Sequence, residues 1–221
     1  KIAQVIQIAD YQVAPYLVLA TKRGLVKKSE LTLFDSARQG GVIAINLKDD
    51  DELVSAALIS AEDDLLMTSR QGQSNRFRAS DDSLRPMGRA TSGVIGMRYG
   101  MDDELLSMEV VRDGLELLIA TAYGYAKRTS VDEYPTHNRG GKGVRTFEYD
   151  ARRGPLVAAL AVHRDDELFA ITSSGGVIRT PVKPVRSTKR QTKGVKLMDL
   201  PDGVTLLAVA RNADEPDGQD E

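Results

Sequence analysis

The sequence of 221 residues contains no cysteine, no tryptophan and only two histidines. Without cysteine there is no disulfide, no thiol nucleophile and no zinc–thiolate site. The two histidines, His137 and His163, are too few for a metal site, and we expect both on the surface. No apolar run approaches the roughly 18 residues of a membrane-spanning helix, and the start does not resemble a signal peptide. The lack of cysteine is consistent with the cytoplasm.

The motifs of common catalytic and nucleotide-binding sites are also missing. No serine lies in a Gly-x-Ser-x-Gly setting, and no dinucleotide-binding fingerprint opens a helix. The stretch HNRGGKGV at 137–144 is not a nucleotide-binding phosphate loop, because Lys142 is followed by Gly143 and is preceded by His137 where that loop needs a glycine. We therefore expect no catalytic residue, no metal and no cofactor in this chain.

Charge is strongly segregated, although the net charge is only −2. Residues 176–198 hold seven lysines or arginines and no acid. Residues 213–221, ADEPDGQDE, hold five acids and no base, which predicts a disordered tail. This tail is either a solubilising end or a regulatory segment that competes with a polyanion for the basic residues.

What the chain does contain is a unit of about 50 residues that occurs four times. One anchor is a glycine that follows an apolar run, at Gly24, Gly72, Gly124 and Gly175. A second anchor is a Gly-Val pair, at Gly41, Gly93, Gly143 and Gly194. A third is an apolar run that begins at Leu53, Leu105, Leu156 and Leu206. Because independent anchors agree on one period, the sequence predicts a propeller, a solenoid or a similar array.

The runs inside each unit are short, rich in Val, Ile, Leu and Thr, and bounded by Gly, Asp-Asp or Pro, which is typical of β-strands. About four strands per unit match one propeller blade. We expect single helical turns only at 131–135 and 181–185. Carboxylate clusters at 50–52 and 165–167 are interpreted as turn residues that share one repeat position. The fold class is therefore all-β, with one blade-repeat domain over residues 1–212.

The chain begins in the middle of a repeat. Residues 2–8, IAQVIQI, align with the run that starts at Leu53. We therefore expect a partial first blade over residues 1–14, made of the last strand of an earlier blade. This alignment predicts that further blades precede the sequence.

Positive charge recurs beside both glycine anchors. After the first anchor come Lys28, Arg76, Arg128 and Arg179, with Lys27 and Lys127 adjacent. Before the second anchor come Arg38, Arg89, Arg139 with Lys142, and Arg190 with Lys193. The basic window adds Lys183, Arg186 and Lys189. Since equivalent positions of a blade array lie on equivalent parts of its rim, these cations predict a belt that suits duplex DNA. The alternative is that they only keep exposed loops soluble.

The chain resembles the C-terminal domains of DNA gyrase A subunits, most closely those of actinobacteria. The stretches that carry the resemblance are YLVLATKRGLVKKSELTLFDS, LRPMGRATSGVIGMR, GYAKRTSVDEYP, RGGKGV, SGGVIRT and RQTKGVKLM. The resemblance implies a β-pinwheel, a six-bladed propeller-like disc whose blades exchange a strand. It also implies that duplex DNA wraps around the disc edge, so that the holoenzyme introduces negative supercoils.

The family carries a seven-residue box, Gln-Arg-Arg-Gly-Gly-Lys-Gly, and residues 137–143 match five of its seven positions. The resemblance implies that Arg139 and Lys142 contact phosphates, while Asn138 hydrogen-bonds one. It implies that the glycines allow a tight turn and a close approach of DNA, namely Gly140, Gly141 and Gly143. In actinobacterial relatives this copy is the second, and the main box lies in an upstream blade.

The resemblance also implies the partners. These are duplex DNA, the N-terminal breakage-reunion domain of the same gyrase polypeptide, and the second gyrase polypeptide in an A2B2 enzyme of the cytoplasm and nucleoid. ATP and magnesium would act on other domains, with no cofactor in this one. Two alternatives remain: the C-terminal domain of topoisomerase IV, whose box is degenerate, and a protein-interaction propeller. The absence of a Trp-Asp repeat pattern counts against the second.

Overall fold

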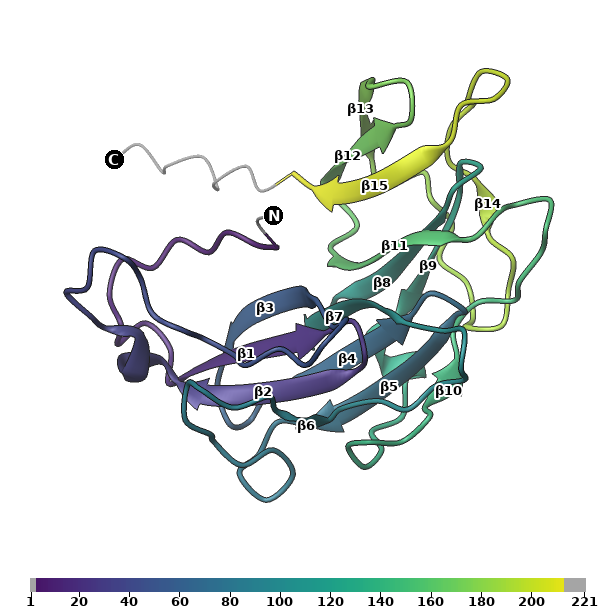
Figure 1. The fold of residues 1–221 in the computed structure, drawn as a ribbon. Helices are drawn as coiled ribbons and strands as arrows, with labels where there is room; N and C mark the ends of the chain where they lie inside the picture. Colours follow the sequence, from purple (N-terminus) through teal and green to yellow (C-terminus); the bar gives the residue numbers. More distant parts are fainter. Residues whose placement is uncertain (1–2, 213–221) are drawn as a thin grey trace, which may run out of the picture.

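The computed structural model describes residues 3–212, which form fifteen β-strands and two short 3₁₀ helices (Figure 1). The strands are grouped into four antiparallel sheets. The first sheet has the order β3-β1-β2-β6, with β1 Tyr16–Thr21, β2 Leu25–Glu30, β3 Leu53–Ile59 and β6 Val94–Ile95. The second has the order β10-β5-β4-β7, with β4 Asp64–Ser69, β5 Gln73–Arg78, β7 Leu105–Val111 and β10 Val144–Arg145.

The third sheet has the order β11-β8-β9-β14, with β8 Glu116–Thr121, β9 Tyr125–Ser130, β11 Leu156–Val162 and β14 Val195–Lys196. The fourth has three strands in the order β13-β12-β15, with β12 Glu167–Thr172, β13 Val177–Pro181 and β15 Leu206–Arg211. The 3₁₀ helices are η1 Leu31–Phe34 and η2 Val131–Glu133. The four sheets follow one another as blades, with β3, β7, β11 and β15 innermost (Figure 1). This confirms the predicted all-β blade repeat.

The outermost strand of each of the first three sheets comes from a later repeat. Val94 of β6 lies opposite Val26, Val144 of β10 opposite Ser74, and Val195 of β14 opposite Ala126. We call β6, β10 and β14 the exchange strands. Their presence confirms the strand exchange that the resemblance implied.

The second glycine anchor is what allows the exchange strand to lie flat on its neighbour. Gly143 has a φ of 69°, a backbone angle that residues other than glycine rarely adopt. A Cβ atom at this residue would overlap the carbonyl of Ser74 on β5. The recurring Gly-Val pair in the sequence therefore marks positions where the backbones of two repeats are in close contact.

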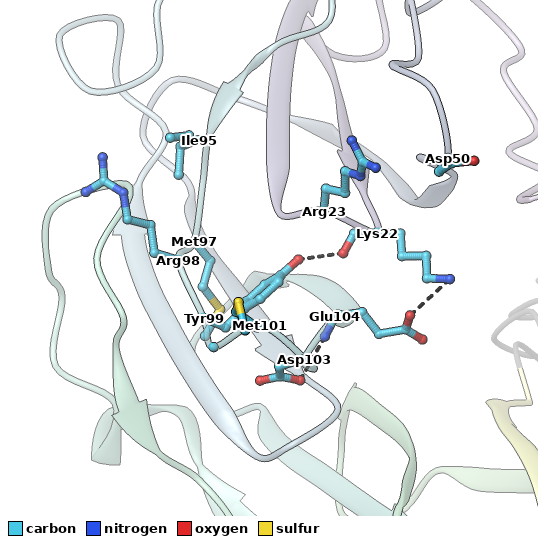
Figure 2. A pocket seen from close by; sticks show the side chains of 11 residues that line it. Lys22, Arg23, Asp50, Ile95, Met97, Arg98, Tyr99, Met101, Asp103 and Glu104 are labelled. Carbon is cyan, nitrogen blue, oxygen red and sulfur yellow. Dashed lines mark hydrogen bonds and ion pairs between the residues drawn. The ribbon is translucent and has the colours of Figure 1, made fainter.

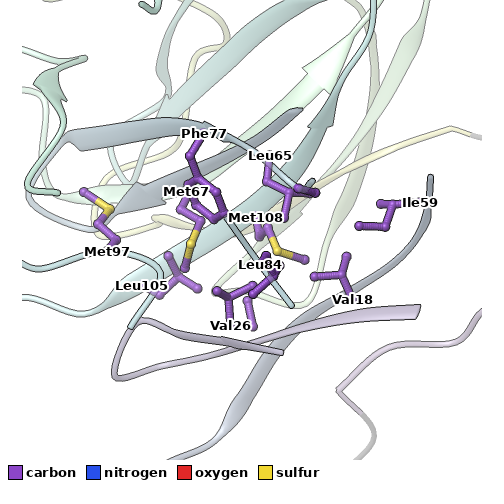
Figure 3. Packing of buried hydrophobic residues seen from close by; sticks show 12 residues of the cluster. Val18, Val26, Ile59, Leu65, Met67, Phe77, Leu84, Met97, Leu105 and Met108 are labelled. Atoms are coloured by element: carbon purple, nitrogen blue, oxygen red, sulfur yellow. The ribbon is translucent and has the colours of Figure 1, made fainter. Parts of the chain in front are cut away.

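The hydrophobic core consists of three clusters, one for each junction between neighbouring blades. Figure 3 shows the first, in which Val18 and Val26 of one sheet pack with Leu65 and Met67 of the next. Met97, which follows the exchange strand β6, is buried in the same cluster. Burying a side chain of this size contributes about 1.5–3 kcal/mol, so strand exchange also adds to the core.

Three local expectations need correction. Residues 3–9 form no strand, because none of the described strands pairs with them; Gln4 instead accepts a hydrogen bond from the N–H of Ala56 at 2.8 Å. The helical turn expected at 131–135 is confirmed as η2, but residues 181–185 form only a strand end and a turn. The helix η1 was not expected. The acidic tail at 213–221 lies outside the described residues.

No helix within residues 3–212 is both long enough and apolar enough to cross a membrane. Among the same residues, no group of three histidine, aspartate or glutamate side chains could hold a metal ion. His137 and His163 are both exposed, as expected.

Candidate nucleic-acid interface

A cationic exposed surface is built from the loops that precede the Gly-Val anchors. We define these exchange loops as residues 35–41, 84–93, 136–143 and 186–194. Each ends in the Gly-Val anchor, and for the last three loops the strand exchange fixes where the loop emerges from the blades.

Successive exchange loops are linked, in sequence order, through the segments that follow their anchors. The N–H of Asn46 donates to the carbonyl of Thr91 at 3.0 Å, and the N–H of Arg98 donates to the carbonyl of Gly141 at 3.0 Å. The N–H of Glu148 repeats this contact with the carbonyl of Thr192 at 3.5 Å. Each segment after one Gly-Val anchor thus holds the exchange loop of the next repeat, and the four loops form a continuous row.

This row, together with Lys183 just before its last loop, carries exposed cations without ion-pair partners. Among residues 3–212, no ion pair involves the side chains of Arg38, Lys142, Lys183, Arg186 or Lys189, and all five residues are exposed. Unpaired cations in a row keep their charge available for a polyanion.

Shallow pockets lie within the row. One of about 470 Å³ is lined by Arg38 and Arg89, which brings the first two exchange loops together. Another of about 470 Å³ lies inside the last loop and is lined by Arg186, Lys189 and Lys193. Lys193 is also within 3.6 Å of Asp150, so part of its charge is compensated.

Arg139 and Arg190 have a mixed role, because each half-buried guanidinium fixes a neighbouring segment. Arg139 donates to the carbonyls of Ser83 at 2.7 Å and Ile95 at 2.6 Å. Arg190 donates to the carbonyl of Arg145 at 3.1 Å. A guanidinium has five N–H donors, so both residues retain donors for a phosphate.

The box at 137–143 forms a tight turn at the edge of the second sheet. Asn138 is exposed, and its carbonyl accepts a hydrogen bond from Asn75 at 3.3 Å. Gly140 is buried and packs near the carbonyl of Ile95, while Gly141 lies against Asn75. Lys142 therefore projects from a turn whose backbone is held in place by Asn75 and packs near Ile95.

Four of the predicted DNA contacts are wrong: Lys27, Lys28, Lys127 and Arg128 are buried. Lys27 donates from Nζ to the carbonyls of Ala44 and Arg89. Burial and, to a smaller extent, the charge of Arg89 together lower the pKa of Lys27 to about 8. A side chain that is enclosed in this way cannot reach a phosphate.

Lys127 is the equivalent residue two sheets later. It donates from Nζ to the carbonyls of Lys189 and Arg190, at 3.1 Å in the case of Lys189. Burial lowers the pKa of Lys127 to about 8, with a further contribution from the charge of Arg190. These two lysines support the exchange loops from inside instead of forming their surface.

The cations four residues after the first anchor link blades to one another. Lys28 donates to the carbonyl of Ala79 at 2.6 Å, Arg76 to that of Val131 at 3.0 Å, and Arg128 to that of Val185 at 2.7 Å. Each acceptor belongs to the next repeat. The cations at this repeat position, which were predicted as part of the belt, therefore join neighbouring blades. Arg76, whose guanidinium is half-buried, is one of them.

Each cation at this repeat position also faces the residue twelve positions earlier on its own sheet. Lys28 lies 4.5 Å from the ring centre of Tyr16, and Arg76 lies 2.8 Å from Asp64. Arg128 pairs with Glu116, and Arg179 with Glu167 at 2.6 Å. Arg179, on β13, is exposed. The recurrence of the cation in the sequence thus reflects an internal pairing.

Three exposed arginines in or beside the row were missed by sequence reasoning: Arg85 within the second exchange loop, and Arg98 and Arg145 just after the anchors. Arg98 and Arg145 line a cleft of about 1070 Å³ together with Lys142 and the rings of Tyr99 and Phe147. The signal was present, because Arg145 follows the Gly143-Val144 anchor directly. The prediction included only cations before that anchor.

The carboxylate clusters are turn residues, as expected, but they occupy two repeat positions rather than one. Before β3 and β7, Asp51 accepts from the N–H of Arg23 at 3.0 Å, and Asp103 accepts from that of Gln71 at 3.0 Å. Before β12, Asp166 accepts from the N–H of His163 at 2.8 Å. Figure 2 shows a pocket of about 500 Å³ beside the first type of turn, where Glu104 pairs with Lys22 at 3.0 Å.

Comparison with known proteins agrees with this geometry. The model of the family "DNA gyrase C-terminal domain, beta-propeller" matches four segments, residues 15–60, 63–112, 115–163 and 166–212. The DNA gyrase A protein of Mycobacterium bovis is 65% identical over 215 residues, which is 97% of this chain and 26% of the relative. The chain thus spans about a quarter of the length of such relatives.

Two solved structures share the fold. A structure of a DNA gyrase A C-terminal domain superposes with a TM-score of 0.81 at 29% identity, over 92% of this chain and 68% of that one. The C-terminal domain of a DNA topoisomerase IV gives a TM-score of 0.85 at 24% identity, over 95% of this chain and 65% of that one, which supports the fold alone. From the four matched repeats and the exchanged strands, the chain belongs to the family of DNA gyrase C-terminal domains.

Proposed function

We propose that this chain binds duplex DNA along the row of exchange loops and bends it around the blades. The observation that carries the proposal is the linkage of successive exchange loops through the segments after their anchors, which places unpaired cations of different repeats in one line. The proposed phosphate contacts are Arg38, Arg85, Arg89, Arg98, Asn138, Arg139, Lys142, Arg145, Lys183, Arg186, Lys189, Arg190 and Lys193.

The chemistry of these contacts predicts weak sequence preference and strong dependence on salt. Lysine and arginine read the phosphates, which are the same in every sequence. Each phosphate that is neutralised adds about 0.9 to the slope of log K against log salt. Bending 20–30 base pairs smoothly costs on the order of 1–6 kcal/mol, which contacts from several repeats offset together.

As part of the longer protein, this domain would present wrapped DNA to the breakage-reunion domain of a gyrase, a type IIA topoisomerase of A2B2 composition in the bacterial cytoplasm. DNA cleavage and ATP hydrolysis would belong to the other domains. The names of the highly identical relatives favour gyrase over topoisomerase IV.

The proposal is tested by measuring the affinity for a duplex over a salt series. The variant Lys142→Gln/Lys189→Gln removes two exposed cations of the row, and Arg112→Gln/Arg164→Gln removes two exposed cations outside the exchange loops. We expect the first variant to lose about 1.8 from the salt slope and the second to keep it. An equal effect of both variants would favour non-specific attraction, and an effect of neither would favour the protein-interaction alternative.

Wrapping is tested separately, by ligating nicked circular DNA in the presence of the chain. A shift in linking number that disappears in Lys142→Gln/Lys189→Gln supports bending along the exchange loops. Binding without any shift would leave DNA binding standing and refute bending by these four blades.

A further inference from the structure

The four exchange loops are not equally charged. The first carries one arginine, Arg38, and one acid, Asp35. The second and third each carry two cations and no acid, and the last carries four cations and no acid, namely Arg186, Lys189, Arg190 and Lys193. Because like charges at this spacing repel one another, the last loop gains more than the others from a bound anion.

The cations of the last loop surround a pocket. Its volume is about 470 Å³, and the described residues that line it include no carboxylate. Three cationic and three hydroxyl side chains belong to the lining, namely Arg186, Lys189, Lys193, Ser187, Thr188 and Thr192. The pocket of similar volume at the first two loops has only two arginines, beside Ile43 and Ala90. Amines, guanidinium groups and hydroxyls are the groups that contact phosphates in protein–DNA complexes.

Main-chain donors are also available at this pocket. Among residues 3–212, no hydrogen bond uses the main-chain N–H of Lys189 or that of Lys193, and both residues line the pocket. Backbone N–H groups in turns bind the oxygens of anions. The last loop therefore combines positive charge with neutral donors around one space.

The backbone of this loop is fixed before any anion binds. The N–H of Thr188 donates to the carbonyl of Arg128 at 2.8 Å, and the N–H of Arg128 donates to the carbonyl of Arg186 at 3.1 Å. The hydroxyls of Thr188 and Thr192 lie 2.8 Å apart and join the two halves of the loop. A phosphate would therefore meet donors that are already ordered, which lowers the entropy lost on binding.

Two carboxylates stand next to the pocket without lining it. The amine of Lys193 lies 3.6 Å from Asp150 and 3.9 Å from Glu148. Ion pairs of this length between partly exposed groups contribute little to stability, so a phosphate can replace them. Lys193 is thus already positioned beside oxyanions.

We propose that this pocket is a discrete phosphate-binding site, which takes one backbone phosphate of the duplex and anchors the DNA at the fourth repeat. For the source of the phosphate, the inference rests on the proposed function. The side chains of Arg186, Lys189 and Lys193 neutralise the phosphate, while the main-chain N–H groups donate to its oxygens. The other exchange loops have fewer cations and attract the duplex more weakly.

Inorganic phosphate is the first probe, used without DNA. The ¹⁵N-labelled chain is titrated with sodium phosphate at constant ionic strength, and the amide shifts are followed by NMR. We expect saturable shifts concentrated in residues 186–194. Lys189→Gln/Lys193→Gln should bind phosphate at least about tenfold more weakly, and Arg112→Gln/Arg164→Gln should bind it like the unaltered chain. Shifts that do not saturate, or that are equal in all four loops, would overturn the site.

Asp150→Asn should give the opposite change. The variant keeps an acceptor for the N–H of Arg152 but removes the carboxylate nearest to Lys193. We expect phosphate to bind about two- to fivefold more tightly, which is the worth of an exposed ion pair. Asp199→Asn is the matched control, because Asp199 pairs with Lys196 outside the pocket. An equal gain in both variants would contradict a site at Lys193.

A short duplex without terminal phosphates then identifies the source of the phosphate. We expect it to shift the same amides and to displace inorganic phosphate. Its affinity should fall further in Lys189→Gln/Lys193→Gln than in Arg85→Gln/Lys142→Gln, which removes as many cations from the second and third loops. Equal losses, or a duplex that binds without displacing phosphate, would refute the anchor and leave the proposed function standing. Phosphate binding without any duplex binding would refute both, and the pocket would then serve a free phosphate group.

Discussion

The side chain of Lys127 donates a hydrogen bond from its buried Nζ to the main-chain carbonyl of Lys189, 3.1 Å away. A lysine inside one repeat thereby positions the loop that exposes a lysine of the next. Lys27 does the same for the carbonyl of Arg89, and Asn75 for that of Asn138 at 3.3 Å. The charge of the exchange loops thus depends on polar residues that never reach the surface.

The first prediction concerns this support. In Lys127→Met, the carbonyls of Lys189 and Arg190 lose their donor, and each buried unpaired group costs about 1–3 kcal/mol. The last exchange loop should therefore open locally. We expect the amide of Leu197, which bonds to Gly124 in the adjoining exchange joint, to exchange its hydrogen at least about tenfold faster.

Hydrogen exchange followed by mass spectrometry checks this result. Lys189→Met is the matched control, because it removes an exposed amine and leaves the carbonyl of residue 189 bonded to Lys127. Unchanged exchange at Leu197 in Lys127→Met would mean that the buried amine does not hold the loop.

The second prediction is a dependence of stability on pH. Burial lowers the pKa of both Lys27 and Lys127 from 10.5 to about 8, with smaller contributions from Arg89 and Arg190. Between these values the unfolded chain binds protons that the folded chain has released. The free energy of unfolding contributed by these lysines therefore rises as the pH increases from about 8 to 10.

Urea unfolding at several pH values in this window measures the rise. The variant Lys27→Met/Lys127→Met should show a smaller rise than the unaltered chain, because the two depressed groups are gone. If the two proteins respond to pH in parallel, the amines titrate normally and are not desolvated.

The third prediction concerns the glycine that seats an exchange strand. In Gly143→Ala the new Cβ would overlap the carbonyl of Ser74, so β10 cannot remain on β5. Gly203→Ala has nearly the same φ, 77° compared with 69°, but no neighbour within 4 Å. The midpoint of thermal unfolding should fall clearly further for Gly143→Ala, and the difference isolates the steric overlap from the backbone strain. Equal losses would show that only strain matters.

Much of the architecture could be predicted from the sequence because the repeat records it. The Gly-Val anchors correspond to real joints at Gly93, Gly143 and Gly194, and the apolar runs form the strands of the sheets. The direction of side chains could not be predicted in the same way. Lys28 and Arg76 recur at one repeat position, but whether that position faces solvent or the next blade depends on contacts between units that are distant in sequence.

The same reasoning explains which part of the candidate site was found. Lys142 and Lys189 lie in loops whose glycines and threonines leave no apolar surface to cover, so their exposure follows from local sequence. Lys127 and Arg128 lie on β9, between β8 and the exchange strand β14, and their burial became visible only with the structure. A carboxylate twelve residues before the arginine, as with Glu116 and Arg128, is the sequence signal that would have identified the internal set.

The last prediction distinguishes by experiment the cations that join blades from the cations that are exposed in the exchange loops. Arg76→Met leaves the buried carboxylate of Asp64 with Arg78 as its remaining ion-pair partner among residues 3–212. Burial alone would raise the pKa of Asp64, but hydrogen bonds from Arg76 and Arg78 hold it below its usual value. Because one partner remains, we expect the free energy of unfolding to fall by about 3 kcal/mol, the lower end for a broken buried pair.

Lys142→Gln should behave in the opposite way, since its amine has no ion-pair partner among the described residues. Its stability should stay within about 0.5 kcal/mol of the unaltered chain, while the salt slope for duplex binding falls by about 0.9. Arg76→Met, measured where it is still folded, should keep that slope. A loss of slope in Arg76→Met with full stability would return this arginine to the DNA-binding surface, because a residue that joins blades affects DNA only through folding.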